Sequence, residues 1–114
     1  GALGGPRLDH LVGNLLLLTS PRLEGVRVRM ADDLHEAFLV KGDTELTGTD
    51  GDIVSLLPLT PEVDEVRTEG LLYPLAGETL HQSSTRGVSN VMTDARARVS
   101  HGSGVLLLIH YRGR

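Results

Sequence analysis

Residues 82–90 gather side chains that can hydrogen-bond a polar ligand. Hydroxyl groups and one amide surround Gly87; they belong to Ser83, Ser84, Thr85, Ser89 and Asn90. Such groups both donate and accept hydrogen bonds, so together they suit a neutral polar heterocycle. The same residue types are also typical of an ordinary polar turn. The composition therefore leaves a binding loop and a plain turn both open.

A second candidate site lies in the glycine-rich opening of the chain. Backbone N–H groups at Gly4 and Gly5, ahead of a helix, can hold a phosphate. Arg7 is of a type that binds phosphate through two N–H groups, and the carboxylate of Asp9 can hold Mg²⁺. The segment lacks the Walker spacing and the G-x-G-x-x-G pattern, so a simple turn is also consistent with it. Asp9 would then be an ordinary helix-start carboxylate, stabilised by the helix dipole.

The remaining titratable residues lack the spacing of a catalytic or metal centre. None of the five histidines forms a His-x-His or His-x-x-x-His pair, so we expect solvated or structural histidines. No G-x-S-x-G nucleophile elbow is present. The acidic clusters lack the regular ladder of an EF-hand loop, which predicts solvated turns instead. These clusters comprise Asp32, Asp33, Glu36, Asp43, Glu45, Asp50 and Asp52.

Chain-wide properties narrow the class of protein. The 114 residues suffice for about one domain. The formal net charge of −4 argues against binding nucleic acid through overall positive charge. The absence of cysteine excludes disulfides and thiolate chemistry, and no apolar run reaches the roughly 20 residues that span a membrane. We therefore expect a cytoplasmic protein that binds neither nucleic acid nor membranes.

Helical periodicity is confined to the segment after Pro6. Leucine recurs there at steps of three and four, at Leu8, Leu11, Leu15 and Leu18. Residues 15–18 are apolar on almost every side, as in a helix that is buried on more than one face. A small β domain covers one face, so another chain or a missing domain is expected to cover the rest. Together with Gly1 in place of an initiator methionine, this pattern favours a fragment of a longer protein.

Beyond Pro21, apolar residues alternate with a period of two in short stretches separated by turn residues. This pattern predicts strands over residues 26–30, 37–40, 46–47, 53–57, 66–68, 79–80, 96–99 and 105–109. A polar stretch over residues 60–64 leads to the strand at 66–68, and residues 81–87 are expected to form a polar loop. Several short strands with frequent turns predict an antiparallel sandwich or barrel.

Four motifs follow one another along the chain. They read GALGGPRLDH at residues 1–10, GDIVSLLPL at 51–59, TEGLLYPL at 68–75, and GVSN at 87–90 ahead of the closing strand at 103–109. In this order they resemble the motifs of the thiamine pyrophosphokinase family. The resemblance spans nearly the whole chain.

The resemblance implies an enzyme that transfers a pyrophosphoryl group from ATP to the hydroxyethyl group of thiamine, with Mg²⁺. It also implies a homodimer in which thiamine sits between the β-sandwich of one subunit and the α/β domain of the other. For this chain it predicts a mainly β fold, with a jelly-roll-like antiparallel β-sandwich that binds thiamine over residues 23–114. Residues 1–22, with their single α-helix, would be left over from the end of the α/β catalytic domain.

The same resemblance implies roles for residues in both parts of the chain. The nucleotide-side residues, which share the first motif, are Gly4, Gly5, Arg7 and Asp9. Of these, Arg7 and Asp9 would be catalytic and Asp9 would hold Mg²⁺, while Arg7 and the two glycines would contact the phosphates of ATP. The thiamine-side residues are Gly70, Leu72, Gly87, Ser89 and Asn90. Ser89 and Asn90 would hydrogen-bond the aminopyrimidine of thiamine. Gly70 and Leu72 would lie on a strand near that pocket.

The chain departs from the family pattern in several places. Pro6 is inserted before Arg7, and Val91 stands where many members carry Glu. The family's earlier acidic motifs, which belong to its α/β domain, are missing. Phosphoryl transfer depends on the positioning of phosphates and metal, so this chain alone is expected to bind Mg·ATP poorly and to lack catalysis. The alternative is a stand-alone β domain that binds a small ligand or serves assembly, without enzymatic activity.

Overall fold

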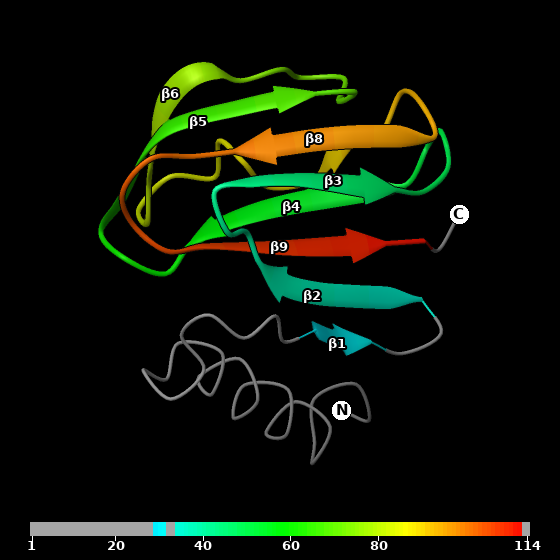
Figure 1. The fold of residues 1–114 in the computed structure, drawn as a ribbon, viewed down its shortest axis with the longest axis horizontal. Coiled ribbons are helices and arrows are strands. Elements are labelled where there is room, and N and C mark those ends of the chain that lie inside the picture. The colour runs from blue at the N-terminus through cyan, green and yellow to red at the C-terminus, as the bar shows by residue number, and fades with distance from the viewer. Residues whose placement is uncertain (1–28, 32–33, 113–114) are drawn as a thin grey trace.

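The computed structural model describes residues 29–31 and 34–112, which form short strands joined by turns (Figure 1). The strands are β1 (Arg29–Ala31), β2 (His35–Leu39), β3 (Asp43–Thr47), β4 (Ile53–Pro58), β5 (Glu62–Glu69), β6 (Ala76–His81), β7 (Asn90–Val91), β8 (Arg96–Ser100) and β9 (Leu106–Tyr111). The expected helix over residues 8–18 lies outside the described residues, as do Gly4, Gly5, Arg7 and Asp9. Among the described residues, no helix has the length and apolar character needed to cross a membrane.

The strands form two antiparallel sheets. One sheet has five strands in the order β1-β2-β9-β4-β7, and the other has four in the order β3-β8-β5-β6 (Figure 1). Buried side chains from both sheets belong to one apolar cluster, with Val54 and Leu56 from the first sheet and Val66 and Val99 from the second. The prediction of a mainly β, antiparallel sandwich is therefore confirmed for the described residues.

The core between the sheets is almost entirely aliphatic. On β4, Val54 and Leu56 are fully buried while Ser55 between them is half-buried, so the strand alternates between the core and the opposite face. Phe38 is the one aromatic side chain of this core in the described part of the chain. Burial of each large aliphatic side chain contributes about 1.5–3 kcal/mol, so many such residues can replace the aromatic residues that the sequence lacks.

β9 is apolar on both of its faces. Leu106 and Leu108 belong to the core between the sheets, whereas Leu107 is buried in a second apolar cluster. The other members of the second cluster are Ala37, Leu39, Leu57, Leu59 and Ile109. Because neighbouring side chains on a strand point to opposite faces, this second cluster lies on the outer face of the five-stranded sheet. The two apolar layers explain why residues 105–109 form a continuous apolar run.

β5 is longer than its sequence pattern indicates. The pattern predicts a strand only over residues 66–68, after a polar stretch at 60–64, but β5 begins within that stretch, at Glu62. The register between β5 and β6 shifts between Val63 and Val66, and both valines are fully buried. A bulge therefore places two core residues three positions apart, which breaks the period-two pattern. Glu65 within this bulge has a left-handed backbone, with a φ of 51°.

The turn after β5 corrects a second expectation. Gly70 and Leu72 do not lie on a strand: β5 ends at Glu69, and the chain then makes an isolated bridge between Leu71 and Met92. Gly70 has a φ of 79°, a left-handed conformation that glycine adopts without strain. This turn places residues 70–75 beside β7.

Candidate functional site

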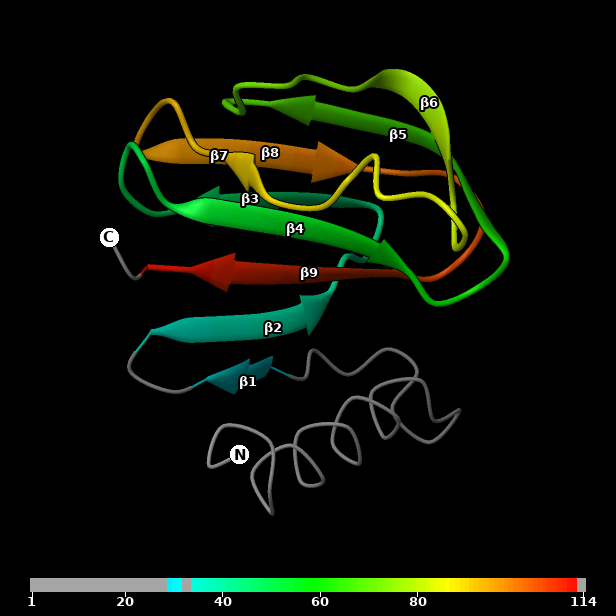
Figure 2. The same ribbon diagram turned by 180° about the vertical axis from the view of Figure 1, so that it is seen from behind.

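The GVSN motif lies at the edge of the five-stranded sheet, beside β4 (Figure 2). We refer to residues 87–92 as the β7 segment. At its start the N–H of Leu56 donates to the carbonyl of Gly87 at 2.8 Å, and at its end the N–H of Met92 donates to the carbonyl of Asp52 at 2.8 Å. Between these contacts, the two residues of β7 pair with β4. The GDIVSLLPL motif, which contains β4, therefore supports the GVSN motif along its length.

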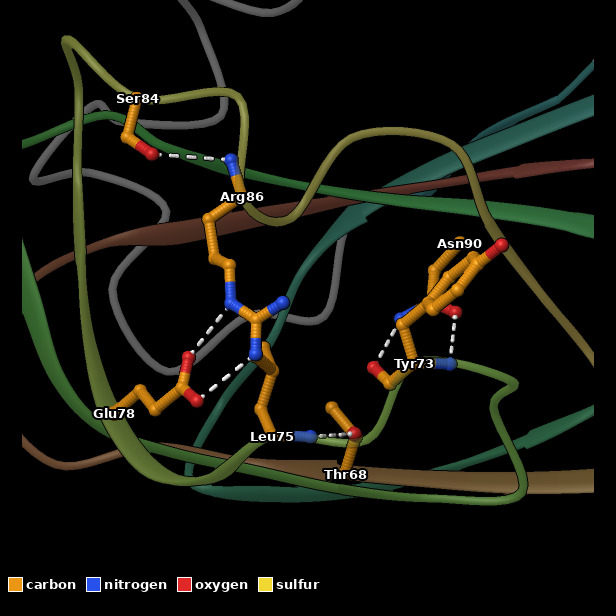
Figure 3. Close-up of polar contacts among 7 residues, drawn as sticks. All are labelled: Thr68, Tyr73, Leu75, Glu78, Ser84, Arg86 and Asn90. Atoms are coloured by element: carbon orange, nitrogen blue, oxygen red, sulfur yellow. Dashed lines mark hydrogen bonds and ion pairs between the residues drawn. The ribbon is translucent and has the colours of Figure 1, made fainter.

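Asn90 is buried, and its side chain joins the β7 segment to the turn after β5. Its Oδ1 accepts hydrogen bonds from the backbone N–H groups of Tyr73 at 3.0 Å and Val91 at 2.9 Å, and its Nδ2 donates to the carbonyl of Tyr73 at 2.7 Å (Figure 3). Nδ2 carries two hydrogens, and one of them suffices for this bond. The amide thus fixes the backbone of Tyr73 and retains one donor for a further partner.

The turn after β5 is held at its base as well as at Tyr73. The N–H of Leu75 donates to Oγ1 of Thr68 at 2.9 Å, and the N–H of Thr68 donates to the carbonyl of Leu75 at 2.9 Å (Figure 3). Between these anchors Leu72 and Tyr73 are exposed, with 51% and 57% of their surface accessible. An exposed tyrosine with a fixed backbone offers a ring face to a planar ligand.

The sequence interpretation missed Tyr73. The signal that could have revealed it is the scarcity of aromatic residues, which are Phe38, Tyr73 and Tyr111. Of these, Phe38 is buried and Tyr111 is half-buried. Tyr73 is followed by Pro74 within a turn, and it is the one exposed residue of the three.

Ser89 is exposed, and it has a left-handed backbone with a φ of 58°. Its N–H donates to Oγ of Ser55 at 2.9 Å. Ser89 and Asn90 are consecutive, but the first is exposed and the second is buried. The structure therefore brings both predicted residues to one place, with the serine hydroxyl toward solvent and the amide against Tyr73.

Gly70 and Gly87, the two glycines assigned to the thiamine side, both lie where another chain segment approaches closely. A Cβ atom at Gly70 would lie 2.3 Å from the carbonyl oxygen of Arg96, and one at Gly87 would lie 2.6 Å from the carbonyl oxygen of Leu56. Neither oxygen belongs to a flexible side chain that could move aside. The two glycines therefore allow the close packing that shapes the site.

Gly70→Ala is expected to lower the free energy of unfolding by about 2–4 kcal/mol, because both the left-handed backbone and the contact with Arg96 oppose a Cβ. Gly42→Ala is the matched control, since Gly42 has a φ of 68° but nothing within 4 Å of a Cβ. That control should cost about 1 kcal/mol. Urea unfolding monitored by circular dichroism measures both. Equal losses would contradict a role for the close approach.

Arg86 and Glu78 link the loop before the β7 segment to β6. Nε and Nη2 of Arg86 donate to the two carboxylate oxygens of Glu78, each at 2.9 Å (Figure 3). The hydrogen bond from Arg86 holds the pKa of Glu78 below its usual value, and the same bond raises the pKa of Arg86. Both groups therefore stay charged at neutral pH, and the pair orients the loop at a small net gain in stability because both side chains are exposed.

Asp52 corrects the expectation of a solvated turn. It is 1% exposed, and its Oδ2 lies 2.7 Å from Nε2 of His110, which is also buried. The N–H of Thr49 donates to the same oxygen at 3.0 Å. The Asp52 side chain thus joins the turn at Thr49 to His110 on β9. His110 is therefore a structural histidine, as expected.

The nucleotide-side prediction rests on residues that the structure does not describe. Arg7 and Asp9, the proposed catalytic pair, precede residue 29. Among residues 29–31 and 34–112, no group of three or more histidine or carboxylate side chains could hold a metal ion.

A comparison with known families decides the assignment. The family model described as "Thiamin pyrophosphokinase, vitamin B1 binding domain" matches residues 42–106, more than half of the chain. The chain belongs to this family. The matched residues include Gly70, the β7 segment and most of the strands that support them, so the candidate site built above lies within the matched region.

Individual relatives of the vitamin B1 binding domain agree with the family match. Thiamine pyrophosphokinase of Bacillus subtilis (strain 168) is 27% identical over 111 residues, which are 96% of this chain and 51% of the relative. The chain therefore spans about half the length of the curated relative that it matches.

Solved structures show the same fold. That of thiamine pyrophosphokinase from Bacillus subtilis superposes with a TM-score of 0.84 at 23% identity, covering 96% of this chain and 53% of that one. The enzyme from Geobacillus thermodenitrificans gives a TM-score of 0.81 at 24% identity, covering 96% and 51%. The Candida albicans enzyme gives 0.73 at 18% identity, covering 94% and 41%. Even at this low identity, the sandwich is shared.

Proposed function

We propose that this chain is the thiamine-binding part of a thiamine pyrophosphokinase, which transfers a pyrophosphoryl group from ATP to thiamine to give thiamine diphosphate. The observation that carries the proposal is the β7 segment within the vitamin B1 binding domain: a buried Asn90 holds the exposed Tyr73, and an exposed Ser89 stands beside them. These groups suit one planar, polar and cationic ligand.

Each part of thiamine has a partner in this arrangement. The aminopyrimidine can bond to the hydroxyl of Ser89 and to the second N–H of Asn90. The face of the Tyr73 ring attracts cations, and the thiazolium ring of thiamine is a cation. Leu72 and Val88, exposed to 51% and 41%, supply apolar surface near these groups. Gly70 and Gly87 contribute through the shape of the backbone rather than through contacts of their own.

The nucleotide side of the proposal lies in the rest of the protein. Gly4, Gly5 and Arg7 would contact the phosphates of ATP, and Asp9 would hold Mg²⁺, which neutralises phosphate charge when bound. Residues 1–22, with one helix, would be the end of an α/β catalytic domain. Residues 23–114 would form the jelly-roll-like sandwich. We further propose a cytoplasmic homodimer in which thiamine lies between the sandwich of one subunit and the α/β domain of the other.

The 114-residue chain alone is expected to form no AMP from ATP and thiamine with Mg²⁺. The earlier acidic motifs of the family's α/β domain are missing from these 114 residues, and pyrophosphoryl transfer depends on groups that position phosphates and metal. Release of AMP, followed by chromatography, measures the reaction, and a complete kinase of the family serves as the positive control. Thiamine-dependent turnover by the isolated chain would contradict the assignment of catalysis to the other domain.

Thiamine binding itself tests the proposed function. Addition of thiamine to ¹⁵N-labelled chain is expected to shift the amide resonances of Tyr73, Ser89 and Asn90, because these residues surround the proposed site. Tyr73→Ala should weaken binding, whereas Tyr111→Ala, on β9, is the aromatic control. Shifts confined to other strands would mean that the ligand binds elsewhere.

A further inference from the structure

The second motif of the chain, GDIVSLLPL, has no role in the proposed thiamine contacts, yet it runs along the whole β7 segment. Leu56 contacts Gly87, and Asp52 contacts Met92, through backbone hydrogen bonds of 2.8 Å each. Ser55 makes a further cross-strand bond: its Oγ accepts the N–H of Ser89 at 2.9 Å. This is a side-chain contact, and it therefore depends on the residue type at position 55.

The surroundings of Ser55 make a hydroxyl unexpected there. Ser55 pairs in register with Ile109 of β9, which pairs in turn with Ala37 of β2. Ala37 and Ile109 belong to the apolar cluster on the outer face of the sheet. A valine or alanine would suit that row and the strand at least as well as serine. The hydroxyl is explained by its bond to Ser89.

Ser89 requires such support because of its backbone. Its φ of 58° is uncommon for a residue other than glycine, and such conformations persist where the surroundings hold them. The left-handed turn separates two consecutive side chains: Ser89 is exposed while Asn90 is buried against Tyr73. Without an acceptor for its N–H, Ser89 could relax toward an ordinary conformation and move its hydroxyl.

We propose that Ser55 is a positioning residue for the thiamine site, because its hydroxyl holds Ser89 in the left-handed conformation that presents the Ser89 side chain next to Asn90. This proposal rests on the proposed function for its ligand. Its structural half, the dependence of Ser89 on Ser55, stands on the contact itself. Ser55 acts through Ser89, without contact to the ligand.

The test uses ¹⁵N-labelled 114-residue chain and three variants. Ser55→Ala removes the acceptor, and Ser55→Thr retains a hydroxyl at the same position. Ser100→Ala is the control, since Ser100 is also a half-buried strand serine and has no side-chain hydrogen bond to the described residues. Amide hydrogen exchange of Ser89 reports its backbone, and titration with thiamine up to millimolar concentration reports binding.

Ser55→Ala is expected to speed exchange of the Ser89 amide roughly tenfold and to raise the Kd for thiamine about three- to tenfold. Ser55→Thr and Ser100→Ala should stay within about twofold of the parent chain in both measurements. If Ser55→Ala leaves Ser89 exchange unchanged, the proposal is wrong. Faster exchange with an unchanged Kd also overturns it, because Ser55 would then be purely structural.

The two proposals fail in different ways. If a kinase that contains this chain binds no thiamine even at millimolar ligand, the proposed function of this chain is wrong. Exchange at Ser89 then still decides whether Ser55 holds the loop. If thiamine binds and Ser55→Ala behaves as the Ser100→Ala control does, the proposed function stands and the positioning role of Ser55 is wrong.

Discussion

Asp52→Ala is expected to lower the free energy of unfolding by about 3–5 kcal/mol, because it breaks a fully buried pair and leaves the partner behind. The side chains of Asp52 and His110 are both 0% exposed, and they lie 2.7 Å apart. Nδ1 of His110 already has no hydrogen-bond partner among the described residues. Loss of Asp52 would leave Nε2 without this acceptor as well, and would remove the acceptor for the N–H of Thr49. Urea unfolding followed by circular dichroism measures the loss.

Asp43→Ala provides the matched control for a charge pair at the surface. Asp43 pairs with Arg98 at 3.0 Å, but both side chains are more than half exposed, so the loss should stay below about 1 kcal/mol. A double-mutant cycle with His110→Ala separates the pair from its surroundings. Asp52→Ala combined with His110→Ala should cost clearly less than the sum of the two single changes. Additive losses, or equal losses at Asp52 and Asp43, would mean that the buried pair does not stabilise the fold.

The pair at Asp52 also illustrates what the sequence could not reveal. Asp52 follows Asp50-Gly51, a typical turn, so local composition predicted a solvated carboxylate. Its partner is 58 residues away on β9, and only the pairing of β4 with β9 brings the two together. Gly48 packs against the pair, and a Cβ atom at Gly48 would lie within 3 Å of both the Asp52 and the His110 side chain. The contacts of His110 with Asp52 and Gly48 are not local in sequence.

Strands that alternate regularly were predictable. Ile53–Pro58 and Arg96–Ser100 differ from their predicted ranges by one residue, because one face of each strand is buried and sequence alternation records that burial. Period-two alternation did not predict the full length of β5, where a bulge separates Val63 and Val66 by three positions. It also failed at β7, since two residues are too few to show a period. The edge that carries the site was thus the part least visible to periodicity.

The motifs located the site but did not reveal how its residues act. The positions of Ser89 and Asn90 side by side could be predicted from the GVSN motif. The exposed ring of Tyr73 could not, because its backbone is held by hydrogen bonds with Asn90, 17 residues further along the chain. Gly70 and Gly87 had been assigned to thiamine, yet their closest neighbours are the backbone carbonyls of Arg96 and Leu56. Ser89 and Gly87 of one motif therefore differ: Ser89 is exposed, whereas Gly87 allows the backbone to pack closely.

Asn90→Ala is expected to raise the KM for thiamine about five- to 150-fold in a kinase that contains this chain, with the KM for ATP nearly unchanged. This range corresponds to about 1–3 kcal/mol for a buried amide that is lost from a polar site. Two effects add to each other: the proposed bond to the aminopyrimidine disappears, and Tyr73 loses the amide that fixes its backbone. Steady-state kinetics with each substrate varied in turn separates the two KM values.

Gln82→Ala, an exposed change in the same loop, is the control and should leave both KM values unchanged.

Asn90→Asp distinguishes the two functions of the amide. An aspartate at this position retains acceptors for the N–H groups of Tyr73 and Val91, but it places a carboxylate oxygen against the carbonyl of Tyr73, where Nδ2 now donates at 2.7 Å. If the donor matters, Asn90→Asp should raise the thiamine KM as much as Asn90→Ala does. A normal thiamine KM with a raised ATP KM in either variant would instead mean that the β7 segment serves the nucleotide. Because Asn90 is buried, unfolding of each variant must be measured alongside: a kinetic loss that persists at a temperature where the variant is fully folded belongs to the site.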